Sequence, residues 1–180
     1  MPIIELADPA VVVLIGAAGS GKSTVATRHF APDEILSSDA LRERITGDAA
    51  EQRVTGTVFR IIERSLDARS AAGQLTVVDA TNVKPTDRRP WIAAARRHGL
   101  PAVAIVLALP RHVVHARNAA RPRVVPPDVV DRHLDAIAAM ATPDRLRAEG
   151  FASVIVLDTP EAADAVVVVR RPMAGGALPG

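Results

Sequence analysis

The sequence contains no cysteine and very few aromatic residues. The lack of cysteine excludes a disulfide framework, a thiol nucleophile and cysteine-ligated zinc or iron–sulfur sites. Aromatic residues make up 2% of the chain, with three Phe, one Trp and no Tyr, which disfavours a nucleic-acid binder built on many stacking surfaces. Long apolar runs are also missing. The longest, residues 10–18, is far shorter than a membrane span, and we predict no membrane contact.

Lysine is nearly absent as well, because only Lys22 and Lys84 are lysine and 20 of the 22 basic residues are arginine. With 20 acidic residues the formal net charge is +2, although the pI is about 9.9. Whole-chain charge therefore does not imply a nucleic-acid partner, while local arginine clusters could. The first residues, MPIIE, lack the basic segment that opens a signal peptide. We predict a soluble, cytoplasmic protein.

Short apolar runs alternate with helical patterns along the chain. Val- and Ile-rich runs without polar alternation are typical of strands buried on both faces, as in a parallel sheet. We expect strands at 11–15, 34–36, 75–79, 102–108 and 153–157, and helices at 22–29, 54–72, 85–98 and 127–140. This alternation predicts an α/β fold in one domain, residues 1–170. Residues 166–169 fit either a strand or a helix end, and residues 171–180, RPMAGGALPG, are expected to be a flexible tail or linker.

Residues 16–23 form the phosphate-binding loop pattern G-x-x-x-x-G-K-S/T between a predicted strand and a predicted helix. Glycines let backbone N–H groups turn toward a phosphate, and the helix start adds partial positive charge. Lys22 supplies a mobile ammonium that can follow the transferred phosphoryl group, and Ser23 a hydroxyl ligand for Mg²⁺ or Mn²⁺. We therefore predict ATP or another NTP at this loop. The predicted contacts are Gly16, Ala17, Ala18, Gly19, Ser20, Gly21, Lys22, Ser23 and Thr24.

Asp39 and Arg42 follow the second predicted strand, where carboxyl strand ends face a ligand crevice. Three residues apart at a helix start, they share one face. A carboxylate there can accept a proton from an acceptor hydroxyl, and an arginine beside it can hold an anionic group of that acceptor. The spacing fits equally well with Asp39 as a helix N-cap and Arg42 as its surface partner.

Asp79 ends another buried strand, the position of a carboxylate that holds Mg²⁺ through a water molecule. Thr81 and Asn82 are expected to point into the same crevice. The alternative is that Asp79 caps the turn before Lys84 and Pro85.

Arg117 and Arg121 are four residues apart in an arginine-rich segment followed by Pro122, Pro126 and Pro127. Two like charges on one helical face favour an anion between them. We interpret residues 110–140, the lid segment, as a lid that closes arginines on the phosphates of ATP. The alternative is a solvated arginine face. The histidines show no metal-ligand spacing and are interpreted as structural or surface residues: His29, His98, His112, His115 and His133.

Taken in order, these motifs resemble the kinase domain of bacterial polynucleotide kinase-phosphatase. The resemblance rests on IGAAGSGKST, ILSSDALR, VTG at residues 54–56, LTVVDATNVKPTDRR and ARNAARPRVVPPDVVDRH, and it spans about residues 4–172. It implies a P-loop kinase fold with five parallel strands, the loop strand central, and an arginine-bearing lid. It also implies transfer of a γ-phosphate to the 5′-OH end of RNA or DNA in RNA or DNA repair, with phosphatase and ligase modules as fused or separate partners.

The resemblance also implies roles for individual residues. Lys22 and Ser23 would be the loop lysine and the magnesium ligand, and Asp39 the general base on the 5′-OH, near the metal through water. Arg42 would hold the first phosphate on the 3′ side of the acceptor. Arg117 and Arg121 would be the lid arginines, with Arg117 stabilising charge in the transition state.

Two other functions fit the same motifs. One is a small-molecule kinase acting on a sugar, an antibiotic or a nucleoside, which the scarcity of aromatic residues favours. The other is a non-catalytic module that senses ATP, which the complete set of catalytic positions disfavours. Arg42 beside Asp39 favours a phosphate-bearing acceptor, because a neutral sugar needs no fixed cation.

Overall fold

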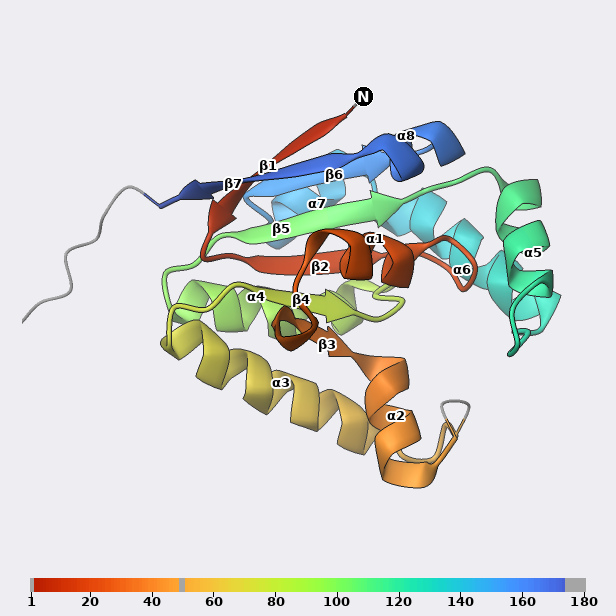
Figure 1. The fold of residues 1–180 in the computed structure, drawn as a ribbon, viewed down its shortest axis with the longest axis horizontal. Helices are drawn as coiled ribbons and strands as arrows, with labels where there is room; N and C mark the ends of the chain where they lie inside the picture. Colours follow the sequence, from red (N-terminus) through yellow and green to blue (C-terminus); the bar gives the residue numbers. More distant parts are fainter. Residues whose placement is uncertain (1, 49–50, 174–180) are drawn as a thin grey trace, which may run out of the picture.

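A five-stranded parallel sheet forms the centre of the molecule in the computed structural model, which describes residues 2–48 and 51–173 (Figure 1). The strand order is β3-β4-β2-β5-β6, so the strand that enters the phosphate-binding loop is central. The strands are β2 (Val11–Ile15), β3 (Ile35–Ser37), β4 (Thr76–Asp79), β5 (Ala102–Leu107) and β6 (Ser153–Leu157). Every pair is parallel, which confirms the predicted α/β class.

Helices cover both faces of this sheet (Figure 1). On one face α3 (Thr55–Ala71), α4 (Pro85–Arg97) and α7 (Pro143–Glu149) pack side by side, and on the other lie α1 (Lys22–His29) and α8 (Pro160–Ala165). Beyond the carboxyl ends of the strands lie α2 (Ser38–Thr46), α5 (Arg111–Ala119) and α6 (Pro127–Met140). A short 3₁₀ helix, Pro32–Glu34, precedes β3.

Complete burial explains why the central strands could be found from sequence. Every residue of β2, β4 and β5 is buried, so these strands carry apolar side chains on both faces rather than on alternate positions. Burying a Val, Leu or Ile side chain contributes roughly 1.5–3 kcal/mol. The sheet therefore holds the loop after β2 and the turn after β4 on a rigid base.

A second, two-stranded parallel sheet escaped the sequence analysis. It pairs β1 (Ile3–Asp8) with β7 (Val167–Pro172), in register from Ile3 opposite Val167 to Asp8 opposite Pro172. Each strand is only partly buried, and the partners lie at opposite ends of the chain. Local periodicity carries no information about such a pairing. Of the ambiguous residues 166–169, Val166 caps the end of α8, and residues 167–169 become a strand only through their distant partner.

The predicted tail boundary needs correction at its first residues. Arg171 and Pro172 belong to β7, where Arg171 Nη2 donates to Glu5 Oε1 at 3.0 Å, rather than to a flexible tail. The rest of the predicted tail, from residue 174 onward, lies outside the described residues. Within the described part of the chain, no helix has both the length and the apolar character needed to cross a membrane.

Candidate functional site

A cleft of about 1140 Å³ opens at the carboxyl edge of the main sheet. Its walls come from the phosphate-binding loop, α2, α3, the start of α4, the lid segment and α8. All four predicted catalytic residues line it: Lys22, Asp39, Arg42 and Arg117. So do Ser23, Asp79 and Arg121, which means that residues as far apart in sequence as Lys22 and Arg121, 99 positions, meet at one site.

The phosphate-binding loop has the backbone that its glycines predict. Gly19 and Gly21 have φ of 84° and 94°, in the left-handed region that favours glycine. A Cβ at Gly19 would also lie 2.6 Å from the carbonyl oxygen of Val114, so α5 packs directly on the loop. Of the predicted contacts, these line the cleft: Ala18, Gly19, Gly21, Lys22, Ser23 and Thr24. The others are buried beneath the loop surface: Gly16, Ala17 and Ser20.

Lys22 begins α1 with its ammonium folded back onto the loop. Its Nζ donates to the carbonyl oxygens of Gly16 at 2.9 Å and Ala17 at 2.8 Å. Burial lowers the pKa of Lys22, while the carboxylates of Asp79 and Asp39 act in the opposite direction. The ammonium therefore lies on the loop within electrostatic reach of both carboxylates, at a position from which it can bind a phosphoryl group.

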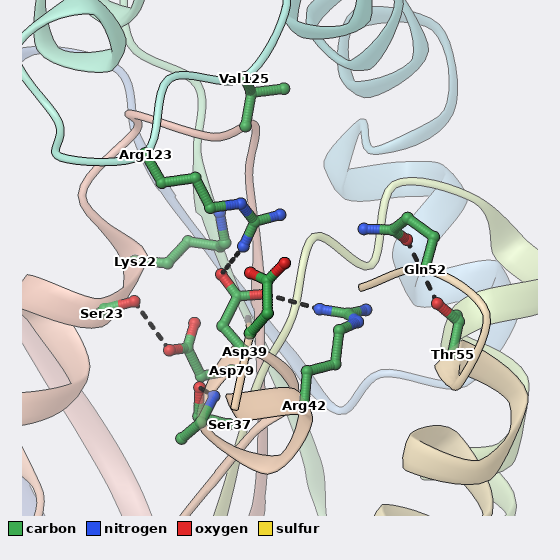
Figure 2. A network of polar contacts seen from close by, with 12 residues as sticks. Lys22, Ser23, Ser37, Asp39, Arg42, Gln52, Thr55, Asp79, Arg123 and Val125 are labelled. Atoms are coloured by element: carbon green, nitrogen blue, oxygen red, sulfur yellow. Dashed lines mark hydrogen bonds and ion pairs between the residues drawn. The ribbon is translucent and has the colours of Figure 1, made fainter. Parts of the chain in front are cut away.

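Ser23 and Asp79 form a pair of oxygen ligands beside Lys22. Ser23 Oγ donates to Asp79 Oδ2 at 2.8 Å, which joins the start of α1 to the end of β4 (Figure 2). Asp79 does not cap the next helix, because Asp87 Oδ2 accepts from the backbone N–H of Lys84 there. A hydroxyl and a carboxylate are hard oxygen donors and fit Mg²⁺, which binds few protein groups and takes further ligands from phosphates and water. Among the described residues, no group of three or more acidic or histidine side chains that could hold a metal ion occurs.

Asp39 and Arg42 lie in the first turns of α2, facing each other across one helical face (Figure 2). Arg42 Nη1 donates to Asp39 Oδ1 at 2.6 Å. Ser37, not Asp39, is the N-cap, because its hydroxyl accepts from the backbone N–H of Ala40. The side chain of Arg42 is 8% exposed and that of Asp39 49%, so Arg42 is not a surface partner. The pair thus presents a carboxylate toward the cleft, fixed from behind by a buried cation.

The lid segment differs in one respect from the sequence interpretation. Arg117 and Arg121 both line the cleft, but α5 ends at Ala119, so they do not share a helical face. Asn118, missed by the sequence analysis, fixes the turn. Its Nδ2 donates to the carbonyl of Val125 at 2.8 Å, and its Oδ1 accepts from the Val125 N–H at 3.1 Å. An amide side chain can bind both polar groups of one backbone residue in this way, although no sequence pattern indicates which backbone residue that will be.

Asn82 does not point into the cleft, contrary to the sequence interpretation. It is buried with φ of 49°, a left-handed backbone that Asn tolerates well. Its Nδ2 donates to the carbonyl of Leu14 at 2.7 Å, and its Oδ1 accepts from Trp91 Nε1 at 3.0 Å. Trp91 in turn stacks on Phe59 with ring centroids 6.0 Å apart, and Phe59 lines the cleft. Two of the four aromatic residues therefore form one wall behind the site.

His133 projects from α6 into the cleft lining, although the sequence analysis interpreted it only as structural or surface. Its Nδ1 is buried without a hydrogen-bond partner among the described residues. Burial, aided by the positive charge of Lys22, lowers the pKa of His133 from its ordinary value of 6.5, so the ring is neutral at pH 7.

We expect the free energy of unfolding to decrease as the pH falls below about 6.5. The pKa of His133 is lowered by burial in the folded protein, so the unfolded chain binds more protons in this range and is favoured there. In urea titrations at about pH 7.5 and about pH 5.5, the His133→Asn variant should lose less stability on acidification than wild type. The exposed His112→Asn variant is the control. Equal pH dependence in wild type and His133→Asn would contradict this role of His133.

Comparisons with known proteins agree with this architecture. A family model described as an AAA domain matches residues 11–143. No curated protein matches the sequence. Among solved structures, a chain of the Pnkp1/Rnl/Hen1 RNA repair complex is similar with a TM-score of 0.63 and 21% identity, over 74% of this chain and 45% of that chain.

Two similar structures are small-molecule kinases. A sugar kinase from Janibacter sp. HTCC2649 has a TM-score of 0.55 and 25% identity, over 83% of this chain and 85% of that chain. Shikimate kinase from Acinetobacter baumannii has a TM-score of 0.55 and 22% identity, over 87% of this chain and 88% of that chain. Together these neighbours have the P-loop kinase fold in common with this chain.

Proposed function

This chain belongs to the AAA domain family matched by residues 11–143, with a P-loop kinase fold, and on that premise we propose that it transfers the γ-phosphate of ATP or another NTP to the 5′-OH end of RNA or DNA. The observation that carries the proposal is the ion pair of Asp39 with buried Arg42 beside the phosphate-binding loop. A carboxylate suits a hydroxyl acceptor, and a fixed cation beside it suits an acceptor that carries a phosphate near that hydroxyl.

The donor side of the cleft would hold the triphosphate. The N–H groups of the loop and the start of α1 would bind the β- and γ-phosphates, and Lys22 would exchange its loop carbonyls for the γ-phosphate. Ser23 would hold Mg²⁺ directly, with Asp79 and Asp39 bound through water. When bound, the ion neutralises charge that develops between the β- and γ-phosphates.

Asp39 would act on the acceptor side as general base. The 5′-hydroxyl oxygen forms a bond to the γ-phosphorus while the bond from that phosphorus to the β,γ-bridging oxygen breaks, and ADP leaves. The hydroxyl proton passes to a carboxylate oxygen of Asp39. Arg117, whose guanidinium reaches the cleft beside Gly21, would stabilise the negative charge on the transferring group, with Arg121 on the same phosphates.

An Arg42→Ala variant tests the acceptor assignment directly. Loss of a charge-assisted contact to the acceptor phosphate should lower kcat/KM about ten- to a hundredfold for a 5′-OH dinucleotide and for a nucleoside 3′-phosphate. A plain nucleoside should be affected far less, because it has no phosphate to lose. Transfer of labelled γ-phosphate to the three acceptors measures this. An equal drop on all three would assign Arg42 to the fold or to the donor.

A small-molecule kinase is the second candidate, favoured by the 25% identity to a sugar kinase over most of both chains. In that case the best wild-type acceptor would be a sugar, an antibiotic or a nucleoside without phosphate. The same transfer assay therefore separates the two candidates before any variant is made.

Phe59 is the proposed stacking site for a base of a nucleic-acid acceptor, because it lines the cleft and its ring stacks on Trp91. A base stacked on such a ring gains roughly 1–3 kcal/mol. We therefore expect Phe59→Leu to raise the KM for a 5′-OH dinucleotide about five- to a hundredfold, with the KM for ATP unchanged. Exposed Arg60→Ala on the same helix is the control. A KM that stays at the wild-type value would leave Phe59 as a core residue.

End healing in RNA or DNA repair is the process that this activity would serve. Its support is the similarity to a chain of an RNA repair complex, of which this chain spans less than half. Phosphatase and ligase modules would then be partners, supplying the reactions that trim and seal the same ends.

A further inference from the structure

Arg123 reaches from the lid segment to the acceptor side of the cleft. Its Nη1 lies 3.8 Å from Asp39 Oδ2, across the cleft from α2 (Figure 2). The backbone that presents it is fixed, because Asn118 holds Val125, two residues further on, with two hydrogen bonds. The hydrogen-bonded backbone of the lid segment therefore places Arg123 near Asp39, the candidate base.

The arginines of the lid segment lie on two sides of the cleft, the donor side and the acceptor side. Arg117 Nη1 lies 3.4 Å from the position of a Cβ at Gly21, beside the phosphate-binding loop. Arg121 lies near enough to Lys22 for its charge to depress the pKa of that lysine. Arg117 therefore lies against the phosphate-binding loop, whereas Arg123 lies against Asp39.

Both carboxylate oxygens of Asp39 are engaged by cations in the structure. Arg42 binds Oδ1 at 2.6 Å, and Arg123 lies 3.8 Å from Oδ2. Oδ2 has the longer contact, so it is the oxygen that an acceptor hydroxyl can reach once Arg123 moves. The buried Nε of Arg42 also lacks a hydrogen-bond partner among the described residues, which costs free energy until an acceptor group supplies one.

We propose, resting on the proposed 5′-OH kinase activity, that Arg123 is a specificity-determining residue that pairs with Oδ2 of the half-exposed Asp39 until a phosphate of the acceptor draws its guanidinium away. Arg123 and Arg42 then hold that phosphate from the two sides of the cleft. A phosphate offers a guanidinium a shorter, bidentate contact than the 3.8 Å pair with Asp39 provides. A neutral acceptor offers none, and Arg123 stays paired with Oδ2.

This arrangement predicts effects of opposite sign for the two kinds of acceptor. In Arg123→Ala, kcat/KM for a 5′-OH dinucleotide or a nucleoside 3′-phosphate should fall about ten- to thirtyfold, since a charge-assisted contact is lost. For a plain nucleoside, kcat/KM should rise about two- to fivefold, because a partly exposed ion pair with the base is removed. Arg123→Lys keeps the charge but not the bidentate contact, so it should lose the phosphate preference without gaining on the plain nucleoside.

The experiment measures transfer of labelled γ-phosphate to these three acceptors by wild type, Arg123→Ala, Arg123→Lys and Arg132→Ala. Arg132 is a matched control on α6, exposed and paired with Asp128. Binding of a fluorescent ATP analogue and the melting temperature are measured for each variant. The proposal is supported if Arg123→Ala binds the ATP analogue and melts as wild type does, while its kcat/KM falls for the phosphate-bearing acceptors and rises for the plain nucleoside.

Several results would overturn it. An equal loss on all three acceptors together with weaker ATP binding would make Arg123 a donor residue. An unchanged preference in both Arg123 variants would make its contact with Asp39 incidental. Failure of the kinase assignment itself appears in the wild-type data alone, as a preference for a plain nucleoside or a sugar, and is therefore distinguishable from failure of the Arg123 proposal.

Discussion

Lys22→Ala and Ser23→Ala should each nearly abolish phosphoryl transfer while leaving the fold intact. Lys22 holds its ammonium on the loop within electrostatic reach of both carboxylates, and loss of its contact in the transition state costs roughly a hundredfold or more in rate. Ser23 supplies the hydroxyl that donates to Asp79, and this hydroxyl is the proposed direct ligand of Mg²⁺. Single-turnover transfer at saturating ATP measures the chemical step separately from binding.

Lys22→Arg sharpens this test, because it asks whether charge alone is sufficient. The chain uses arginine in 20 of 22 basic positions, yet lysine stands in the loop. A compact ammonium fits between the Gly16 and Ala17 carbonyls, whereas a planar guanidinium with its fixed donors does not. We expect Lys22→Arg to be nearly as inactive as Lys22→Ala. Arg147→Ala, which changes an exposed residue of α7, is the control. A wild-type turnover rate in Lys22→Ala would contradict the proposed kinase activity.

The helices and strands that were predicted correctly are those whose residue pattern lies within one short segment of the sequence. Residues 11–15 and 153–157 are strands and residues 22–29 and 127–140 are helices at the predicted bounds. Strand β2 is wholly buried and wholly apolar, β6 is a Val- and Ile-rich run, and α6 opens on a proline that suits a first helical turn. The phosphate-binding loop is likewise local, so its glycines, Lys22 and Ser23 could be assigned from spacing alone.

The parts that sequence missed depend on contacts between distant segments. The pairing of β1 with β7 joins the two ends of the chain, and neither strand has a strong pattern of its own. Asn82 was expected in the crevice and Asn118 was given no role, yet Asn82 binds a backbone carbonyl 68 residues away and Asn118 one 7 residues away. An amide can serve a ligand or a backbone equally well, and only the surrounding fold decides which.

Asp39 shows how structure resolves an ambiguity that spacing leaves open. An acidic residue at a helix start can cap the helix or face a substrate. Ser37 already caps α2, which leaves the Asp39 carboxylate free of that role, and Arg42 behind it is buried rather than solvated. Arg42 therefore holds one oxygen of a half-exposed carboxylate from a buried position, an arrangement consistent with the role proposed for Asp39.

Asp39→Asn is therefore expected to slow the chemical step by roughly 10²–10⁴ with ATP binding retained. The amide keeps the shape and can still accept a hydrogen bond from Arg42, but it cannot take the proton of the acceptor hydroxyl. The loss should appear in kcat and in the single-turnover rate for every acceptor, including a plain nucleoside. This pattern differs from that of Arg42→Ala, which should affect only acceptors that carry a phosphate.

The decisive comparison sets Asp39→Asn beside Asp144→Asn, which changes an almost fully exposed carboxylate on α7. Titration with a fluorescent ATP analogue and a melting curve establish that Asp39→Asn folds and binds the donor as wild type does. Under those conditions a rate within about threefold of wild type would mean that no proton passes to Asp39, because general base catalysis contributes at least about a hundredfold. The base would then have to be sought elsewhere in the cleft, with the neutral, unpartnered Nδ1 of His133 as the next group to replace.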